Sequence, residues 1–167
     1  EGEARRLGNA WEAYEAEAYD RALQGFVDEQ VERPEDPDVT FNIGSAHYQM
    51  RNYEEAEKSF ATVAMTGGPA LRGQALYNLG NCAFREAERQ KDSDLEKALA
   101  ACKTSVRHYQ DALGLDPGLD DAARNIEVVR LPAGQTYRMI AQRNTVTGNV
   151  SSGVQRGGGG IMARFKS

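Results

Sequence analysis

The chain has 167 residues, of which 40% are hydrophobic and 27% charged, and its formal net charge is −5. This length and composition suit one globular domain with a continuous core. The apolar runs are only a few residues long, far short of the ~20 needed to span a bilayer, and an acidic chain lacks the basic footprint that nucleic acids require. We therefore expect neither a membrane span nor a nucleic-acid partner.

The charges are divided unevenly along the chain. Residues 1–130 contain 15 basic residues and all 25 acidic residues, a net charge of −10, whereas residues 131–167 contain five basic residues and no acid, a net charge of +5. Such a division indicates two parts with different roles.

A glycine recurs at a fixed interval near the start of the chain. Gly8, Gly44 and Gly80 are each 36 residues apart, and a period of this size is typical of repeat proteins. Glycine inside a helix costs up to ~1 kcal/mol relative to alanine, so we expect each of these glycines to allow close approach of a neighbouring helix. Ala22 and Ala56 are expected to make the same close contact from that neighbouring helix.

Each glycine lies in a unit that we interpret as two antiparallel helices, because small and aromatic side chains recur three and four residues apart. The first unit covers about residues 3–36 and the second about 37–68. Phe26 and Phe60, together with Tyr109 of the third unit, are expected to fill the spaces between neighbouring hairpins.

The third unit, about residues 69–118, is longer than the other two. Its glycine precedes the closing Pro117 by 37 residues, against 26 residues in the first unit. Both of its helices must therefore be longer, and we expect them at roughly 70–90 and 93–115. Asp94 is expected to cap the second of these helices.

These units resemble the tetratricopeptide repeat (TPR) family. The resemblance rests on three equivalent segments of this chain, which are Leu7-Gly8-Asn9, Ile43-Gly44-Ser45 and Leu79-Gly80-Asn81. The resemblance covers about residues 3–130. It implies an all-α TPR superhelix of three antiparallel helix hairpins, the third elongated, followed by a capping helix at 119–130. A TPR domain would then occupy residues 1–131, and a basic, glycine-rich, irregular arm residues 132–167.

The end of the repeat region also resembles the TPR proteins of bacterial aerotolerance (Bat-type) operons. The residues that carry this likeness are Leu115-Asp116-Pro117 and the stretch from Ala122 through Arg124-Asn125-Ile126-Glu127 to Arg130. Those proteins are extracytoplasmic and accompany von Willebrand A-type partners. The resemblance implies a periplasmic or cell-surface bacterial protein with a partner of that type.

The basic arm allows two interpretations. Pro132 is expected to end the capping helix, residues 133–145 could form one short helix, and the following Thr, Val, Ser and Gly residues cannot bury a core. The arm is then either a flexible tail or a segment that orders against a second subunit or the acidic body. In the second case the expected contacts are Arg138, Arg143, Arg156 and Phe165.

The two cysteines also leave alternatives open. Cys82 and Cys102 each lie ten residues from Asp92, so in an antiparallel hairpin they stand at the same height. A disulfide is therefore possible, and it would place the chain in an oxidising, extracytoplasmic compartment. The alternative is two buried reduced thiols, consistent with the cytoplasm. Two cysteines do not make a zinc site, and we expect no metal and no cofactor.

We find no catalytic arrangement, and His47 is expected to pack rather than react. The more informative residues face inward on the first helix of each hairpin, where they form a polar groove with aromatic rings, suited to an extended peptide. The residues expected to bind a partner are Arg5, Asn9, Phe41, Asn42, Tyr48, Tyr77, Asn81, Phe84 and Arg85.

In carboxylate-clamp TPR domains, cationic and Asn side chains bind a C-terminal carboxylate. Arg5, Asn9 and Asn42 fall at three of those positions, but the third-repeat positions that are basic in such clamps hold Gln74 and Asn78. This departure puts the clamp function of the chain in doubt.

We therefore expect a non-catalytic scaffold or adaptor that binds an extended peptide or partner protein in the concave groove. The alternative is a structural subunit of a larger assembly, in which the C-terminal arm makes the main inter-subunit contact, including contact with a second copy of the chain.

Overall fold

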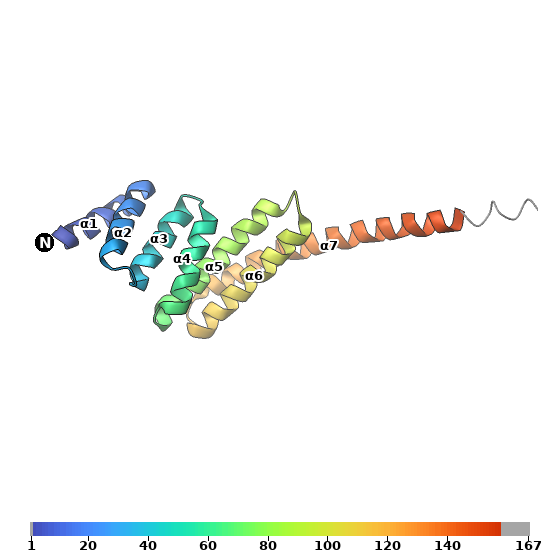
Figure 1. Ribbon diagram of the computed structural model, residues 1–167. Coiled ribbons are helices and arrows are strands. Elements are labelled where there is room, and N and C mark those ends of the chain that lie inside the picture. The colour runs from blue at the N-terminus through green and yellow to red at the C-terminus, as the bar shows by residue number, and fades with distance from the viewer. Residues whose placement is uncertain (1, 158–167) are drawn as a thin grey trace, which may run out of the picture.

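The computed structural model describes the backbone of residues 2–157 and the side chains of residues 8–144. Within this part there are seven helices and no strand. The helices are α1 (Gly2–Glu15), α2 (Tyr19–Glu32), α3 (Pro37–Gln49), α4 (Tyr53–Thr66), α5 (Pro69–Gln90), α6 (Leu95–Leu115) and α7 (Asp120–Gly157). Figure 1 shows them as a row of hairpins in chain order, with α7 extending past the last hairpin. The expected all-α superhelix of three hairpins, with the third elongated, is confirmed.

Local sequence explains where the helices begin. The side chain of Asp36 accepts a hydrogen bond from the Asp38 amide at the start of α3, and Asp94 accepts one from the Lys97 amide at the start of α6. The cap expected at Asp94 is therefore present. Proline occupies the first position of α3 and of α5, where its missing amide hydrogen costs nothing.

The turns inside the first two hairpins share one backbone feature. Glu17 and Arg51 have positive φ angles of 59° and 62°, and each lies two residues before the tyrosine that begins the second helix. Because the same conformation occurs at equivalent places in both hairpins, it belongs to the geometry of the hairpin turn and does not mark one special site.

The core consists of three clusters, each formed by one hairpin together with the helix that follows it. One aromatic ring from a second helix lies at the centre of each cluster: Phe26, Phe60 and Tyr109 are all at most 1% exposed. The expectation that these three rings fill the spaces between hairpins is confirmed, as is the complete burial of Ala22 and Ala56.

Two of the three periodic glycines allow the close approach expected of them. A Cβ atom placed on Gly80 would lie 2.5 Å from Cε1 of Tyr109, and one placed on Gly44 would lie 3.0 Å from Cε1 of Phe60. The same closeness lets the fully buried Ser105 donate a 2.7 Å hydrogen bond to the carbonyl oxygen of Gly80.

Gly8 does not follow this pattern. A Cβ atom there would meet nothing within 4 Å, whereas one on Gly25 would lie 2.7 Å from Cβ of Ala10. The first hairpin therefore makes its close approach through a glycine of α2, and the expectation for Gly8 is wrong, because no second helix crosses α1 at that point.

Helix α7 corrects the expectations for Pro132 and for the arm. Pro132 lies inside α7, although its ring removes one helical hydrogen bond. Past the proline the helix still packs on the last core cluster through Ala133 and the buried Thr136, and Arg143 forms an ion pair with Glu96 at the start of α6. These contacts offset the lost hydrogen bond.

The helix continues to Gly157, so residues 133–157 are not irregular and the expected domain boundary at 131/132 falls inside one element. The composition of this segment opposes a core, but a helix satisfies its own backbone hydrogen bonds without one. Residues 158–167 of the arm lie outside the described part of the chain.

The cysteines are free thiols, so the disulfide alternative is not what the structure contains. Both are buried, but Cys82 belongs to the cluster around α4 and α5, whereas Cys102 belongs to the cluster around α5, α6 and α7. Equal height along a hairpin does not ensure that two side chains face each other. The oxidising compartment inferred from a bridge loses that support.

Within the described helices, none has the length and apolar character for crossing a membrane.

The close approach at Gly80 predicts a contrast between two equivalent glycines. Gly80→Ala should lower the free energy of unfolding by roughly 1–2 kcal/mol, because overpacking against a buried ring outweighs the gain in helix propensity. Gly8→Ala should leave it unchanged or raise it by up to ~1 kcal/mol, because only propensity changes. Urea unfolding of both variants measures this. Equal effects at the two positions would contradict the account.

Candidate functional site

One face of the molecule is defined by hydrogen bonds that skip the second helix of each hairpin. They join α1 to α3, α3 to α5, and α5 to α7, and the bonds are Gln49 Nε2 to Tyr14 Oη (3.3 Å), Arg85 Nε to Tyr48 Oη (3.2 Å) and Asn125 Nδ2 to Tyr77 Oη (3.3 Å). Side chains on successive first helices therefore meet directly, and α7 continues their row. We call this surface the inner face.

Four of the expected partner-binding residues come together at one pocket on the inner face. This pocket, about 140 Å³, lies between α3, α5, α6 and α7, and its lining residues are Tyr48, Asn81, Phe84, Arg85, Tyr109, Asn125, Val128 and Val129. We call it the α7 pocket. Helix α5 contributes three of the residues because positions 81, 84 and 85 fall on one side of a helix.

Sequence reasoning missed the contribution of α7 to this pocket. Asn125, Val128 and Val129 were assigned only to a capping helix. A signal was present, because residues 122–126 echo residues 75–79 and so place Asn125 where the third unit has Asn78. The echo predicts that α7 packs like a further first helix, with its polar side chain turned toward the inner face.

A hydrogen-bond network around Asn81 joins α7 to the third hairpin. Tyr109 Oη donates to Asn81 Oδ1 at 2.7 Å, and Asn125 Nδ2 donates to the same oxygen at 3.3 Å. Asn81 in turn donates to Asn78 Oδ1 at 3.3 Å. Asn125 also donates a hydrogen bond to Tyr77. The polar atoms of Tyr77 and Asn81 are therefore bonded within the chain, and α7 forms this end of the inner face.

The phenols at the α7 pocket stay neutral at physiological pH. Burial raises the pKa of Tyr109 to about 12. Burial also raises the pKa of Tyr48, although the hydrogen bond from Arg85 acts in the opposite direction. Both groups therefore offer hydroxyls and ring surface rather than negative charge.

A second, wider pocket adjoins the α7 pocket and shares Tyr48 and Arg85 with it. It has a volume of about 520 Å³, and its remaining lining residues are Gln49, Arg51, Tyr53, Glu88 and Arg89. Three arginines and one glutamate give this pocket a positive charge. Residues 1–130 as a whole carry a net charge of −10, so the positive pocket stands against the overall charge of the folded body.

The other expected partner-binding residues lie elsewhere. Asn9 is exposed and lines a pocket between α1 and α2. Phe41 is half-buried and packs edge-to-face on Phe60, with ring centroids 5.3 Å apart, so it contributes mainly to the core. Asn42 is half-buried on α3. Arg5 lies on α1, but its side chain is outside the described ones.

The carboxylate-clamp positions are not brought together by any contact among the described side chains. Asn9 lines the α1–α2 pocket, Asn78 is bonded to Asn81, and Gln74 is exposed. Positive charge on the inner face gathers instead around Arg85, at the ends of the first helices.

The expected arm contacts are divided between α7 and the part beyond it. Arg138 is exposed, and Arg143 pairs with Glu96 of the acidic body, as one of the two interpretations of the arm requires. Arg156 lies in α7 with its side chain outside the described ones, and Phe165 lies outside the described residues.

Among the described side chains, no group of three His, Cys, Asp or Glu residues is placed to hold a metal ion.

Comparison with known proteins gives one consistent result. A sequence model described as "Tetratricopeptide repeat" matches residues 7–70 and 41–120. No curated protein matches the sequence. The resemblance to aerotolerance-operon proteins therefore stays a prediction.

Three solved structures with a similar fold are distant in sequence. The first TPR domain of Spaghetti (RPAP3) bound to the HSP90 peptide SRMEEVD has a TM-score of 0.62 at 16% identity, covering 77% of this chain and 90% of that one. The second TPR domain of human RPAP3 in complex with the HSP70 peptide SGPTIEEVD has a TM-score of 0.58 at 16% identity, covering 77% and 98%. The Sgt2 TPR domain from Aspergillus fumigatus has a TM-score of 0.59 at 17% identity, covering 82% of each chain.

The Asn81 network predicts that Asn125 stabilises the packing of α7. Asn125→Ala should lower the free energy of unfolding by about 1 kcal/mol, because it removes a part-buried donor to Asn81 and Tyr77. The neighbouring Arg124→Ala removes only an exposed ion pair with Asp121 and should cost less than ~0.5 kcal/mol. Chemical denaturation of both variants checks this, and equal losses would show that the network contributes nothing.

Proposed function

The chain belongs to the tetratricopeptide repeat family, and on that basis we propose that it is a non-catalytic scaffold or adaptor that binds an extended peptide or a partner protein on its inner face. TPR domains are typically protein-interaction modules rather than enzymes. Two of the similar structures are TPR domains bound to peptides. The von Willebrand A-type partner implied by the Bat-type resemblance stays a prediction.

The observation that carries the proposal is the convergence of Tyr48, Phe84 and Arg85 at the α7 pocket. Aromatic and arginine side chains provide most of the binding energy at protein interfaces, because they combine a large contact area with polar groups. Tyr48 and Phe84 are half-buried and Arg85 is exposed, so the three side chains remain accessible to a partner while the fold holds them in place.

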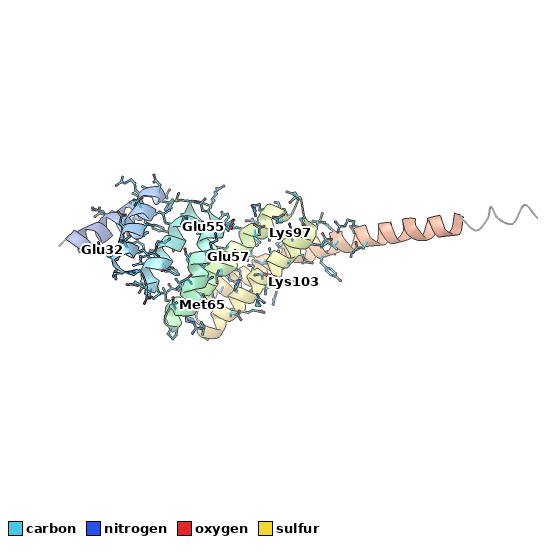
Figure 2. All side chains as sticks on the ribbon, in the orientation of Figure 1. Glu32, Glu55, Glu57, Met65, Lys97 and Lys103 are labelled. Carbon is cyan, nitrogen blue, oxygen red and sulfur yellow. The ribbon has the colours of Figure 1, made fainter. Side chains whose placement is uncertain are left out.

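The outer surface offers a weaker case. Figure 2 labels exposed side chains of the second helices, which are Glu32 on α2, Glu55, Glu57 and Met65 on α4, and Lys97 and Lys103 on α6. These long, charged or flexible side chains carry both signs of charge. Lys, Glu and Asp are depleted at the centres of interfaces, so this face supplies control positions rather than a binding site.

Peptides selected from a random displayed library on the intact chain test the proposal. Tyr48→Ala and Phe84→Ala should each weaken binding at least tenfold, because each truncates an aromatic contact. Lys103→Ala and Met65→Ala, on the outer surface, should leave the affinity within about twofold. Fluorescence anisotropy measures the affinities, and circular dichroism confirms that each variant is folded. Selected peptides that bind Tyr48→Ala and Phe84→Ala as well as the unchanged chain would refute inner-face binding.

A second candidate function is that of a structural subunit whose C-terminal arm makes the main inter-subunit contact. The observation in its favour is that α7 extends beyond the hairpins (Figure 1) and exposes large apolar side chains from Leu131 onward. Leu131, Tyr137 and Met139 are 65%, 63% and 52% exposed. Leu131 and Met139 lie eight residues apart and so fall on one side of the helix, where a second copy of the chain can pack.

Sedimentation of the full chain over a range of concentrations tests this second candidate. The unchanged chain should associate, and Leu131→Ser combined with Met139→Ser should weaken association at least tenfold by removing apolar contact area. Tyr48→Ala should associate normally, because it lies outside the arm. Equal association of the double variant and the unchanged chain would rule out an interface through these residues.

A further inference from the structure

The polar atoms that line the α7 pocket are largely bonded to one another. Asn81, Tyr109 and Asn125 form the network described above, with donor–acceptor distances of 2.7–3.5 Å. A polar guest would have to compete with these bonds, and breaking them leaves part-buried groups unpaired. Polar atoms make up about half of the accessible lining, and most of them are already bonded within the chain, so the carbon atoms between them are the part that is free for new contacts.

The apolar part of this surface comes from the half-buried rings of Tyr48 and Phe84 and from Val128 of α7, which is 56% exposed. Val129 and the Tyr109 ring also line the pocket but are buried. The pocket volume of about 140 Å³ is close to that of an engineered ~150 Å³ cavity that binds benzene. One aliphatic or aromatic side chain matches this pocket in size and can contact the carbon atoms of Tyr48, Phe84 and Val128.

The arginines at the mouth of the pocket are partly neutralised, because Arg85 pairs with Glu88 and Arg89 pairs with Glu86. Arg85 donates from Nε to Tyr48 and from Nη1 to Glu88 at 2.8 Å. Within the described part of the chain, neither Arg85 Nη2 nor the guanidinium of Arg51 forms a hydrogen bond or an ion pair, so these two groups are free to contact an anion. Arg51 and Arg89 line the adjoining wider pocket together with Arg85.

Charge therefore changes sign beside the apolar pocket, on a body that is otherwise acidic. An acidic group is attracted to this place and repelled from most of the remaining surface. A guanidinium nitrogen that is still free to donate binds a carboxylate through a charge-assisted hydrogen bond.

We propose that the α7 pocket is an anchor site for an acidic peptide, which inserts one apolar side chain between Tyr48, Phe84 and Val128 and places a neighbouring carboxylate on Arg85. This inference rests on the proposed function, since it names the class of peptide that the inner face selects. The site differs from the carboxylate-clamp positions, because it lies at the ends of α3 and α5 and depends on α7. Asn125 closes the inner face beyond it, so the anchor marks one end of the bound peptide.

A selection followed by a double-mutant cycle tests the proposal on the full chain. The probe is a fluorescein-labelled peptide from the random library, together with two variants of it, one with the acid changed to its amide and one with the apolar anchor changed to serine. The selected peptides should share an apolar residue next to an acidic one. Arg85→Gln should weaken the selected peptide about tenfold.

The coupling between the two partners is the decisive result. Arg85→Gln should have little further effect on the amide peptide, because the carboxylate that it contacts is already gone. Val128→Asn should weaken the selected peptide severalfold and leave the serine peptide nearly unchanged. Arg107→Gln, which removes one exposed positive charge from α6, serves as the control for net charge and should leave all three affinities alike.

The failure of this inference can be distinguished from failure of the proposed function. If Tyr48→Ala and Phe84→Ala abolish binding but Arg85→Gln weakens the acid and amide peptides equally, inner-face binding stands and the acidic anchor is overturned. Selected peptides that lack an acid overturn it as well. If binding is insensitive to Tyr48→Ala and Phe84→Ala, the proposed function itself is wrong.

Discussion

The contact between the Tyr109 ring and the backbone of Gly80 determines much of the rest of the structure. Only glycine leaves room for the ring, since a Cβ atom would lie 2.5 Å from it. The ring fills the core between α5, α6 and α7, and its hydroxyl continues past the core to Asn81. One side chain thus fixes the distance between two helices and also orients a polar group on the inner face. The packing of the third hairpin and the shape of the α7 pocket are therefore set together.

The fold could be predicted from the sequence because its main signals are local. The aromatic residues in the second helices and the aspartate before α6 each act over one or two helical turns, and the 36-residue period repeats this local pattern along the chain. Gly8 shows the limit of a period: it matches Gly44 and Gly80 in sequence, yet the first hairpin makes its close contact at Gly25. A repeat predicts which residues are equivalent but not which of two facing helices supplies the small residue.

The errors concern contacts between segments that are distant in sequence. Pro132 is a strong local signal for a helix end, but the packing of Ala133 on the last core cluster and the ion pair of Arg143 with Glu96 outweigh it. Equal heights along the hairpin made a Cys82–Cys102 disulfide one of two alternatives, but the two thiols are free and belong to different core clusters. The inner face was predicted from helical position alone, so α7 and its Asn125, which close one end of that face, were missed.

The central claim is that the partner binds the inner face beside α7. Backbone amide chemical shifts of the chain, recorded while a selected peptide is added, test it most directly, because every helix reports separately. The account predicts that the shift changes concentrate on α3, on the C-terminal half of α5 and around Val128 of α7. Shift changes concentrated on α2, α4 and the outer side of α6 would contradict it.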